Sequence, residues 1–157
     1  MKKQIIADVL PENERPVINW LDLEALADVE ISSEDSNYPI EAALLAGRNH
    51  GWRAGKPGTQ TLRLLFNQPQ NLHRIQLTFS ESTLTRTQEY VLRWSNDHGQ
   101  TFHQIVRQQW NFSPDGSTLE MEEYALTLSG VTALELIITP DISSQSAFAS
   151  LEKMRIA

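Results

Sequence analysis

The sequence has 157 residues, about the length of one domain, and its 40% hydrophobic and 21% charged residues are ordinary for a globular protein. This composition excludes a disordered chain, whose hydrophobic content would be far lower. Cysteine is absent, which excludes a disulfide framework, a thiolate metal site and a thiol nucleophile.

The net charge of −7 is unevenly distributed along the chain. Residues 1–41 hold ten of the 20 acidic and three of the 13 basic side chains, which leaves ten of each for residues 42–157. Neutralising a phosphate backbone requires a basic face, and this chain offers only scattered arginines. We therefore expect no nucleic-acid partner.

The start of the chain, "MKKQIIADVLPENERP", has an apolar stretch that is too short for the core of a signal peptide. No later stretch approaches the roughly 20 apolar residues that a membrane span needs. These features predict a cytoplasmic protein without a membrane partner.

The first predicted element is a short helix over "NWLDLEALA", residues 19–27. Asn19 stands at a plausible N-cap position, and good helix formers follow it. We expect residues 1–27 to form an N-terminal segment whose helix packs on the main domain.

From residue 28 onward the pattern changes to the alternation of polar and apolar residues that is typical of strands. Eight strands are predicted, at residues 28–33, 61–66, 72–79, 89–95, 101–110, 117–128, 133–139 and 150–156. No helix of crossover length separates them. The sequence therefore predicts an all-β fold, an antiparallel sandwich or jelly roll over residues 28–157.

The connections between these strands fall into two sets. Short, turn-like connections are predicted at residues 67–71, 95–100 and 128–132. Longer, irregular ones are predicted at residues 34–60, 80–87, 111–117 and 140–149. Because successive antiparallel strands alternate in direction, the two sets should lie at opposite ends of the sandwich. Binding sites are usually built where long loops gather on a rigid scaffold.

Several motifs, taken together and in order, resemble a known family. The stretch "VEISSEDSNYPIEAALLAGRNHGWRAGKPGTQTLRLLFNQPQNLHRIQLTF" is similar to the first half of a discoidin domain, also called the coagulation-factor type C domain, of the galactose-binding-like superfamily. In that pattern a strand leads to a Leu-Asp-Gly loop, a Trp, a Gln-led strand and a Pro turn. The stretches "YVLRWSNDHGQTF" and "ASLEKMRIA" resemble the family's Ser-x-Asp-Gly strand and its closing strand.

The resemblance implies an eight-stranded antiparallel jelly roll whose first and last strands lie close together. It also implies binding of carbohydrates, lipid head groups or proteins, without catalysis. Many sugar-binding members hold a structural calcium with the loop Asp, nearby carbonyls and the closing Glu. Here Ala46 replaces that Asp and only Glu152 remains, so we expect no calcium and no other cofactor.

The candidate ligand-binding residues belong to the long-loop set. Arginine, asparagine and histidine side chains make directional hydrogen bonds to hydroxyls or carboxylates. A tryptophan either stacks on a sugar ring or packs beneath its loop as an anchor. The predicted contact residues are Arg48, Asn49, His50, Trp52, Arg53 and Arg86. The arginines and His50 are expected to face solvent around a concave rim, and Trp52 to be at least partly buried.

Catalytic machinery is not recognisable in the sequence. Of the four histidines only His50 lies in the long-loop set, and no paired histidine spacing suggests zinc. There is no Gly-x-Ser-x-Gly elbow and no glycine-rich phosphate loop.

Two functions remain open from the sequence. One is a non-catalytic carbohydrate-binding module that uses the long-loop end. The other is an intracellular protein-interaction domain, favoured by the lack of a recognisable signal peptide, the replaced calcium Asp and the acidic N-terminal segment.

Overall fold

The structure is a computed structural model that describes residues 1–4 and 17–157. Every strand pair in it is antiparallel, and the predicted all-β antiparallel jelly roll is confirmed. The elements in chain order are α1 (Leu23–Leu26), β1 (Ala27–Ile31), α2 (Glu41–Leu44), β2 (Trp52–Arg53), β3 (Gln60–Ser80), β4 (Arg86–Ser95), β5 (His103–Phe112), β6 (Leu119–Thr139), β7 (Ser150–Leu151) and β8 (Lys153–Ile156).

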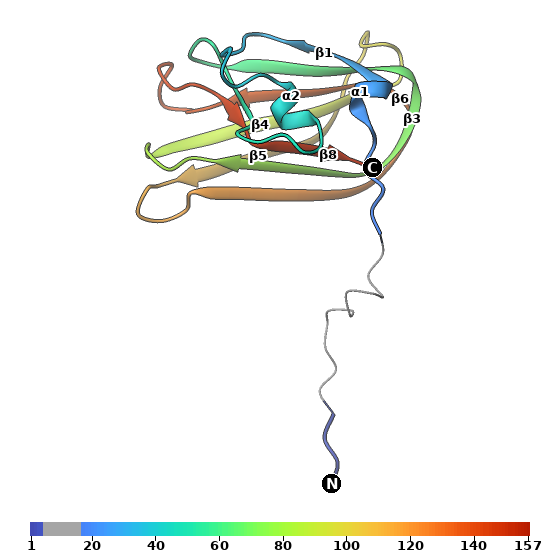
Figure 1. The fold of residues 1–157 in the computed structure, drawn as a ribbon, viewed down its shortest axis with the longest axis horizontal. Helices are drawn as coiled ribbons and strands as arrows, with labels where there is room; N and C mark the ends of the chain where they lie inside the picture. Colours follow the sequence, from blue (N-terminus) through green and yellow to red (C-terminus); the bar gives the residue numbers. More distant parts are fainter. Residues whose placement is uncertain (5–16) are drawn as a thin grey trace.

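Two very long strands, β3 and β6, differ from the prediction. Each spans two predicted strands, so the predicted turns at 67–71 and 128–132 are corners within continuous strands. The register between β3 and β6 shifts repeatedly from Leu65 to Arg74. Such bulges bend a strand without ending it. Figure 1 shows the two strands curving round together at the right of the view.

The corners divide the sheet into two layers. The first layer has the order β1, the first half of β3, the second half of β6, β4 and β5. The second layer consists of β8, the second half of β3 and the first half of β6. Strands β1 and β8 do not pair with each other, because each pairs with a different half of β3.

One hydrophobic core fills the space between the layers. Period-two alternation turns Leu62 and Leu64 inward from the first layer, and Ile75 and Leu77 inward from the second, each with no more than 1% of its surface exposed. The apolar alternation read from the sequence therefore locates the core correctly.

The N-terminal helix is shorter than predicted. It covers only Leu23–Leu26, because Ala27 already pairs with Phe66 as the first residue of β1. Leu23 is buried in the core, and the backbone N–H of Leu21 donates to the carbonyl of Ile156 at 2.7 Å. Residues 21–27 thus pack on the sandwich, whereas Val17 is 86% exposed and residues 5–16 of the predicted segment lie outside the described residues.

The short and the long connections lie at opposite ends of the sandwich, as their lengths predict. At one end the corners of β3 and β6 meet the 95–100 turn, since His98 N–H donates to Thr132 Oγ1 at 2.9 Å and Gly130 N–H to Asn71 Oδ1 at 3.1 Å. The longer connections gather at the other end, on the left of Figure 1.

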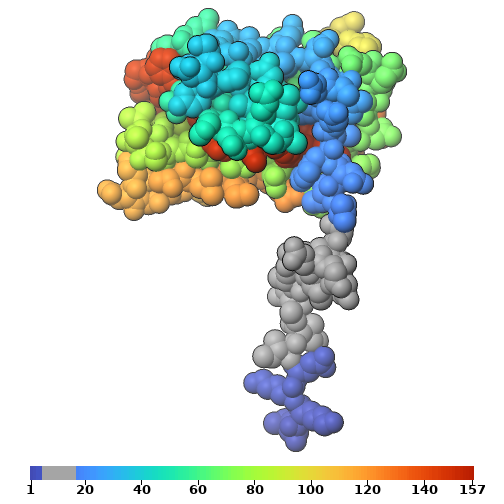
Figure 2. All heavy atoms as spheres, in the orientation of Figure 1, coloured from blue at the N-terminus to red at the C-terminus, as the bar shows by residue number. Residues whose placement is uncertain are grey.

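The second short helix, α2, covers part of the second layer. It packs against β8, and Figure 2 shows the blue to teal atoms of the segment up to α2 lying over the red atoms of the C-terminal strands. Neither helix among the described residues has the length or apolar character needed to cross a membrane.

Candidate functional site

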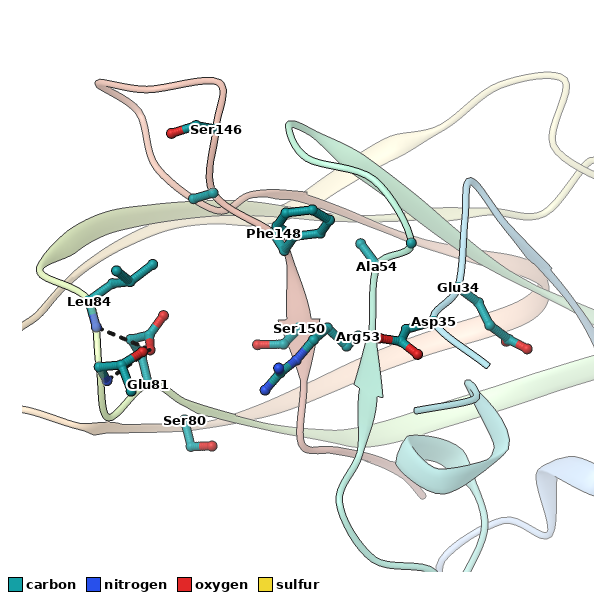
Figure 3. A pocket seen from close by; sticks show the side chains of 13 residues that line it. Glu34, Asp35, Arg53, Ala54, Ser80, Glu81, Leu84, Ser146, Phe148 and Ser150 are labelled. Carbon is teal, nitrogen blue, oxygen red and sulfur yellow. Dashed lines mark hydrogen bonds between the residues drawn. The ribbon is translucent and has the colours of Figure 1, made fainter. Parts of the chain in front are cut away.

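A hollow of about 530 Å³ opens at the long-loop end. Three of the four long connections contribute to it (Figure 3). The lining residues are Glu34, Asp35, Arg53, Ala54, Gly55, Ser80, Glu81, Thr83, Leu84, Ser146, Ala147, Phe148 and Ser150. The fourth connection, residues 113–118 in the structure, does not line the hollow but lies beside it, where Thr118 O accepts from Glu81 N–H at 2.9 Å.

The floor of the hollow is a two-stranded ribbon. Strands β2 and β7 pair antiparallel, with Arg53 opposite Ser150, and the pairing continues beyond them through Ala54 N–H to Ala149 O at 2.9 Å. Successive side chains of an extended chain point to opposite faces. Trp52, Ala54, Ala149 and Leu151 belong to the core and are 0–2% exposed.

The opposite face of this ribbon carries the residues that face the hollow. Arg53, Phe148 and Ser150 lie there, and Figure 3 shows the Phe148 ring above Ser150 and the Arg53 guanidinium. Phe148 is 47% exposed, which is unusual for an aromatic side chain on a strand-like segment. The ribbon therefore presents an aromatic ring and a cation side by side to solvent.

Arg53 is held by an aromatic neighbour. Its guanidinium carbon lies 4.6 Å from the centre of the Tyr38 ring, a cation–π contact that orients the side chain. Within residues 1–4 and 17–157, the ion pairs of the structure do not include Arg53. Its N–H donors thus remain available to a ligand in the hollow.

One wall of the hollow is an acidic turn that contains Glu34 and Asp35. Glu34 Oε2 accepts from Ile40 N–H at 3.1 Å, and Asp35 Oδ1 accepts from Asn37 N–H at 2.9 Å. The turn approaches the ribbon so closely that a Cβ at Gly55 would lie 2.7 Å from Glu34 O. Only glycine allows this backbone approach.

The opposite wall is the loop after β3, organised by Glu81. Its Oε2 accepts from the N–H and Oγ1 of Thr83, both at 3.1 Å, and from Leu84 N–H at 3.3 Å, while Oε1 accepts from Arg86 Nε at 2.7 Å. Partial burial raises the pKa of Glu81, but the hydrogen bonds from Arg86 and Thr83 outweigh it and the net shift is downward. Glu81 is therefore an ionised carboxylate whose charge Arg86 balances.

The structure places the predicted contact residues in three different environments. Arg53 lines the hollow. Trp52 is 1% exposed and lies behind the floor, which confirms its predicted burial. The expectation that Arg86 faces solvent is wrong, because it is 4% exposed and its guanidinium is bonded to Glu81 and to backbone.

The remaining three predicted residues, Arg48, Asn49 and His50, are exposed but do not line the hollow. They form the turn between α2 and β2, where His50 has a positive φ of 74°. Between α2 and β2 no residue lines the hollow, and this segment contributes to it only from Arg53 onward, because Trp52 turns into the core first. The structure therefore does not bring this turn together with the other candidates.

The residues at the expected calcium position do not fit that ion. The Leu44 carbonyl accepts from Arg155 Nη1 at 3.3 Å, and the one remaining carboxylate, Glu152, accepts from Ser80 Oγ at 3.2 Å. Calcium needs six to eight oxygen ligands, and a guanidinium bonded to a nearby carbonyl opposes a second cation. Within the part of the chain that is described, no three His, Cys, Asp or Glu side chains form a metal-binding group.

The sequence interpretation missed Phe148, Glu34, Asp35 and Glu81. For Phe148 the sequence shows only an aromatic residue among the small residues of "SAFAS", and the burial of Ala147 and Ala149, which turns the ring outward, is visible only in the structure. For Glu81 no local pattern distinguishes a carboxylate that organises a loop from a solvated one.

Comparison with known proteins agrees with this architecture. The family model for the F5/8 type C domain matches residues 28–150. None of the curated proteins matches the chain.

Three of the solved structures with the same fold are from Clostridium perfringens. The family 32 CBM of NanJ in complex with galactose has 12% identity and a TM-score of 0.63, covering 87% of this chain and 96% of that one. CpGH89CBM32-5 in complex with GalNAc-β-1,3-galactose has 17% identity and a TM-score of 0.61, covering 88% and 99%. CBM32-3 of a family 31 glycoside hydrolase has 15% identity and a TM-score of 0.64, covering 87% and 93%. At these identities the likeness concerns the fold.

Proposed function

This chain belongs to the F5/8 type C domain family, and we propose that it is a non-catalytic module that binds carbohydrate in the hollow at its long-loop end. The observation that carries the proposal is the exposed Phe148 ring beside Arg53, on a ribbon whose other face is anchored in the core. The sugar complexes of NanJ and CpGH89CBM32-5 support the same class of ligand.

The chemistry of the hollow matches the two kinds of surface on a sugar ring. A pyranose has an apolar patch of C–H groups, which packs on the face of an aromatic ring and displaces water from it. Phe148 provides that face. A rigid aromatic platform loses little side-chain entropy when a ligand binds.

Polar groups around the platform would fix the orientation of the sugar. The Arg53 guanidinium donates hydrogen bonds in a fixed planar geometry, and the Asp35 carboxylate accepts them from hydroxyls. Ser80 and Ser150 add hydroxyl groups that both donate and accept. A ligand with alternating hydroxyls and C–H groups satisfies this set better than a purely apolar one.

The proposal is tested by titrating the protein with galactose, N-acetylgalactosamine and a panel of other neutral and acidic sugars. Binding is measured by thermal shift and by calorimetry. A bound sugar at 100 times its dissociation constant stabilises the fold by about 2.7 kcal/mol. Phe148→Ala and Arg53→Ala should each reduce affinity at least tenfold. Met121→Ala is the matched control, because Met121 is 59% exposed on β6 and does not line the hollow.

Absence of binding to every sugar, or equal affinity of wild type and Phe148→Ala, would overturn the proposal.

The protein-interaction alternative has one observation in its favour. Leu84 and Ile142 are each 50% exposed on the loops of this end, and aliphatic side chains suit a peptide better than a sugar. A peptide-binding site would require these two residues, whereas sugar binding should tolerate their replacement by serine.

A further inference from the structure

Arg86 occupies an unusual position for an arginine in a small β-sandwich. It begins β4 and is 4% exposed, directly behind the wall of the hollow. Its guanidinium carbon lies 4.8 Å from the centre of the Phe112 ring, so one face of the group is covered by an aromatic side chain. A buried guanidinium is tolerated only where its donors are bonded.

The donors of Arg86 reach two of the loops that form the hollow. Nε donates to Glu81 Oε1 at 2.7 Å, and Nη1 donates to the carbonyl of Pro140 at 2.7 Å. Nη1 also lies 3.3 Å from Gln88 Oε1, which continues the polar contacts into the interior. One side chain thus joins the loop after β3 to the loop after β6.

Each of these two contacts of Arg86 holds a different loop at the hollow. Through Glu81, Arg86 holds the Thr83 and Leu84 amides, and so the turn that lines one side of the hollow. Through Pro140 it holds the start of the loop that later carries Phe148, where Ile142 N–H also donates to Thr87 O at 2.9 Å. The position of the loop after β3 relative to the loop after β6 therefore depends on both contacts.

We propose that Arg86 is a positioning residue that sets the shape of the binding hollow by joining the loop after β3 to the loop after β6, without touching the ligand. The effect of Arg86 on ligand binding rests on the proposed function, because it requires that the hollow is the binding site. The geometric part, that one guanidinium orders both loops, stands independently of any ligand.

Two variants separate the contacts of Arg86. Arg86→Met removes the bonds to both loops and keeps the stem of the side chain over Phe112. Glu81→Gln leaves Arg86 and its bond to Pro140 in place but keeps only one accepting oxygen, which can serve either Arg86 Nε or the Thr83 and Leu84 amides and not both. The readout is the rate of amide hydrogen exchange in the ligand-free protein, measured by NMR.

The expected patterns differ between the variants. Arg86→Met should accelerate exchange at least tenfold at Thr83, Leu84 and Ile142 together, whereas Glu81→Gln should do so at Thr83 and Leu84 only. Arg93→Met is the control, because Arg93 pairs with the buried carboxylate of Glu135, away from the hollow. It should leave all three amides protected even if it lowers the melting temperature by a similar amount.

Sugar affinity provides the second readout. Arg86→Met should weaken binding at least tenfold, and Arg86→Lys, which keeps the charge and loses the planar fork, should fall between wild type and Arg86→Met. Unchanged amide exchange at Ile142 in folded Arg86→Met would overturn the proposed role of Arg86. Faster exchange at these amides together with wild-type sugar affinity would also overturn it. If the wild type binds no sugar but the exchange pattern is as described, the proposed function is wrong, and the inference that Arg86 orders both loops still holds. If Arg86→Met does not fold, Arg86→Lys and Glu81→Gln carry the test.

Discussion

The indole Nε1 of Trp52 donates a hydrogen bond of 3.1 Å to the backbone carbonyl of Ser33. This bond ties the strand that bears Arg53, in the floor of the hollow, to the turn that bears Glu34, in the adjacent wall. The ring itself is 1% exposed and belongs to the core.

Replacing Trp52 by alanine should therefore lower the free energy of unfolding by about 3–5 kcal/mol, as for other fully buried aromatic residues. Arg53→Ala should change it by no more than about 0.5 kcal/mol, because that side chain is exposed. Urea unfolding measures both. A stable Trp52→Ala protein that has lost only ligand binding would show that the tryptophan is a ligand platform and not an anchor.

Glycine is required at position 51 for a different reason from that at position 47. Both have positive φ, at 61° and 75°. A Cβ at Gly51 would lie 2.5 Å from the carbonyl oxygen of Leu151, whereas a Cβ at Gly47 meets nothing within 4 Å. Gly47→Ala should cost about 1–2 kcal/mol of backbone strain, and Gly51→Ala about 1–3 kcal/mol more, because of the clash. Equal losses in denaturant unfolding would contradict the close packing of the loop on β7.

A buried carboxyl, Glu120, should make stability depend on pH. It is 1% exposed between the layers, its Oε1 accepts from Gln88 Nε2 at 3.3 Å, and its Oε2 has no hydrogen-bond partner among the described residues. Burial raises the pKa of Glu120 from 4.5 to about 7, and the nearby Glu122 adds to the shift, while Gln88 and Arg86 oppose it.

Because the folded state holds this proton more tightly than the unfolded chain, folding takes up a proton between the two pKa values. Stability should therefore decrease as pH rises from about 4.5 to about 7, by at most about 1.4 kcal/mol per pH unit, and level off above that range. Glu120→Gln removes the titration, so its advantage over wild type should grow across this window. Glu123→Gln, at an exposed ion pair with Arg74, is the control. Parallel stability profiles for wild type and Glu120→Gln would contradict the assignment.

Removal of divalent cations should leave the melting temperature unchanged. The carbonyl of Leu44 is bonded to Arg155, and Glu152 is the only carboxylate left at the expected calcium position. Thermal melting with and without a calcium chelator is the measurement. A drop of several degrees would show that other oxygens of the 44–51 turn hold an ion.

Much of the fold could be predicted because alternation along a strand reports which face is buried. The corners of β3 and β6 could not, since Pro69 and Gly130 are also the residues of tight turns. A proline without an N–H fits a bulge as well as a hairpin. Whether the chain reverses or only bends there depends on pairing with a strand about 60 residues away in the sequence, because Gln70 lies opposite Val131.

The hollow lies at the end of the sandwich where the sequence predicted a site, but only part of its lining was among the predicted residues. Arg86 was read as exposed because the predicted strand began at residue 89. Strand β4 begins at Arg86, and the same alternation that buries Tyr90 and Leu92 also turns Arg86 and Gln88 inward. The acceptors that make this burial tolerable, Glu81 and Pro140, come from other loops and leave no local trace in the sequence.

The two continuous corner strands also have a consequence for how the molecule folds. Their pairing joins Gln60 to Ile138 and Ser80 to Leu119, contacts that are distant along the chain. Closing such large loops costs entropy before any packing repays it, so folding should be slow for a chain of this size. Because β3 and β6 each run through both layers, neither layer can separate without unravelling the other, and the sandwich should melt as one cooperative unit.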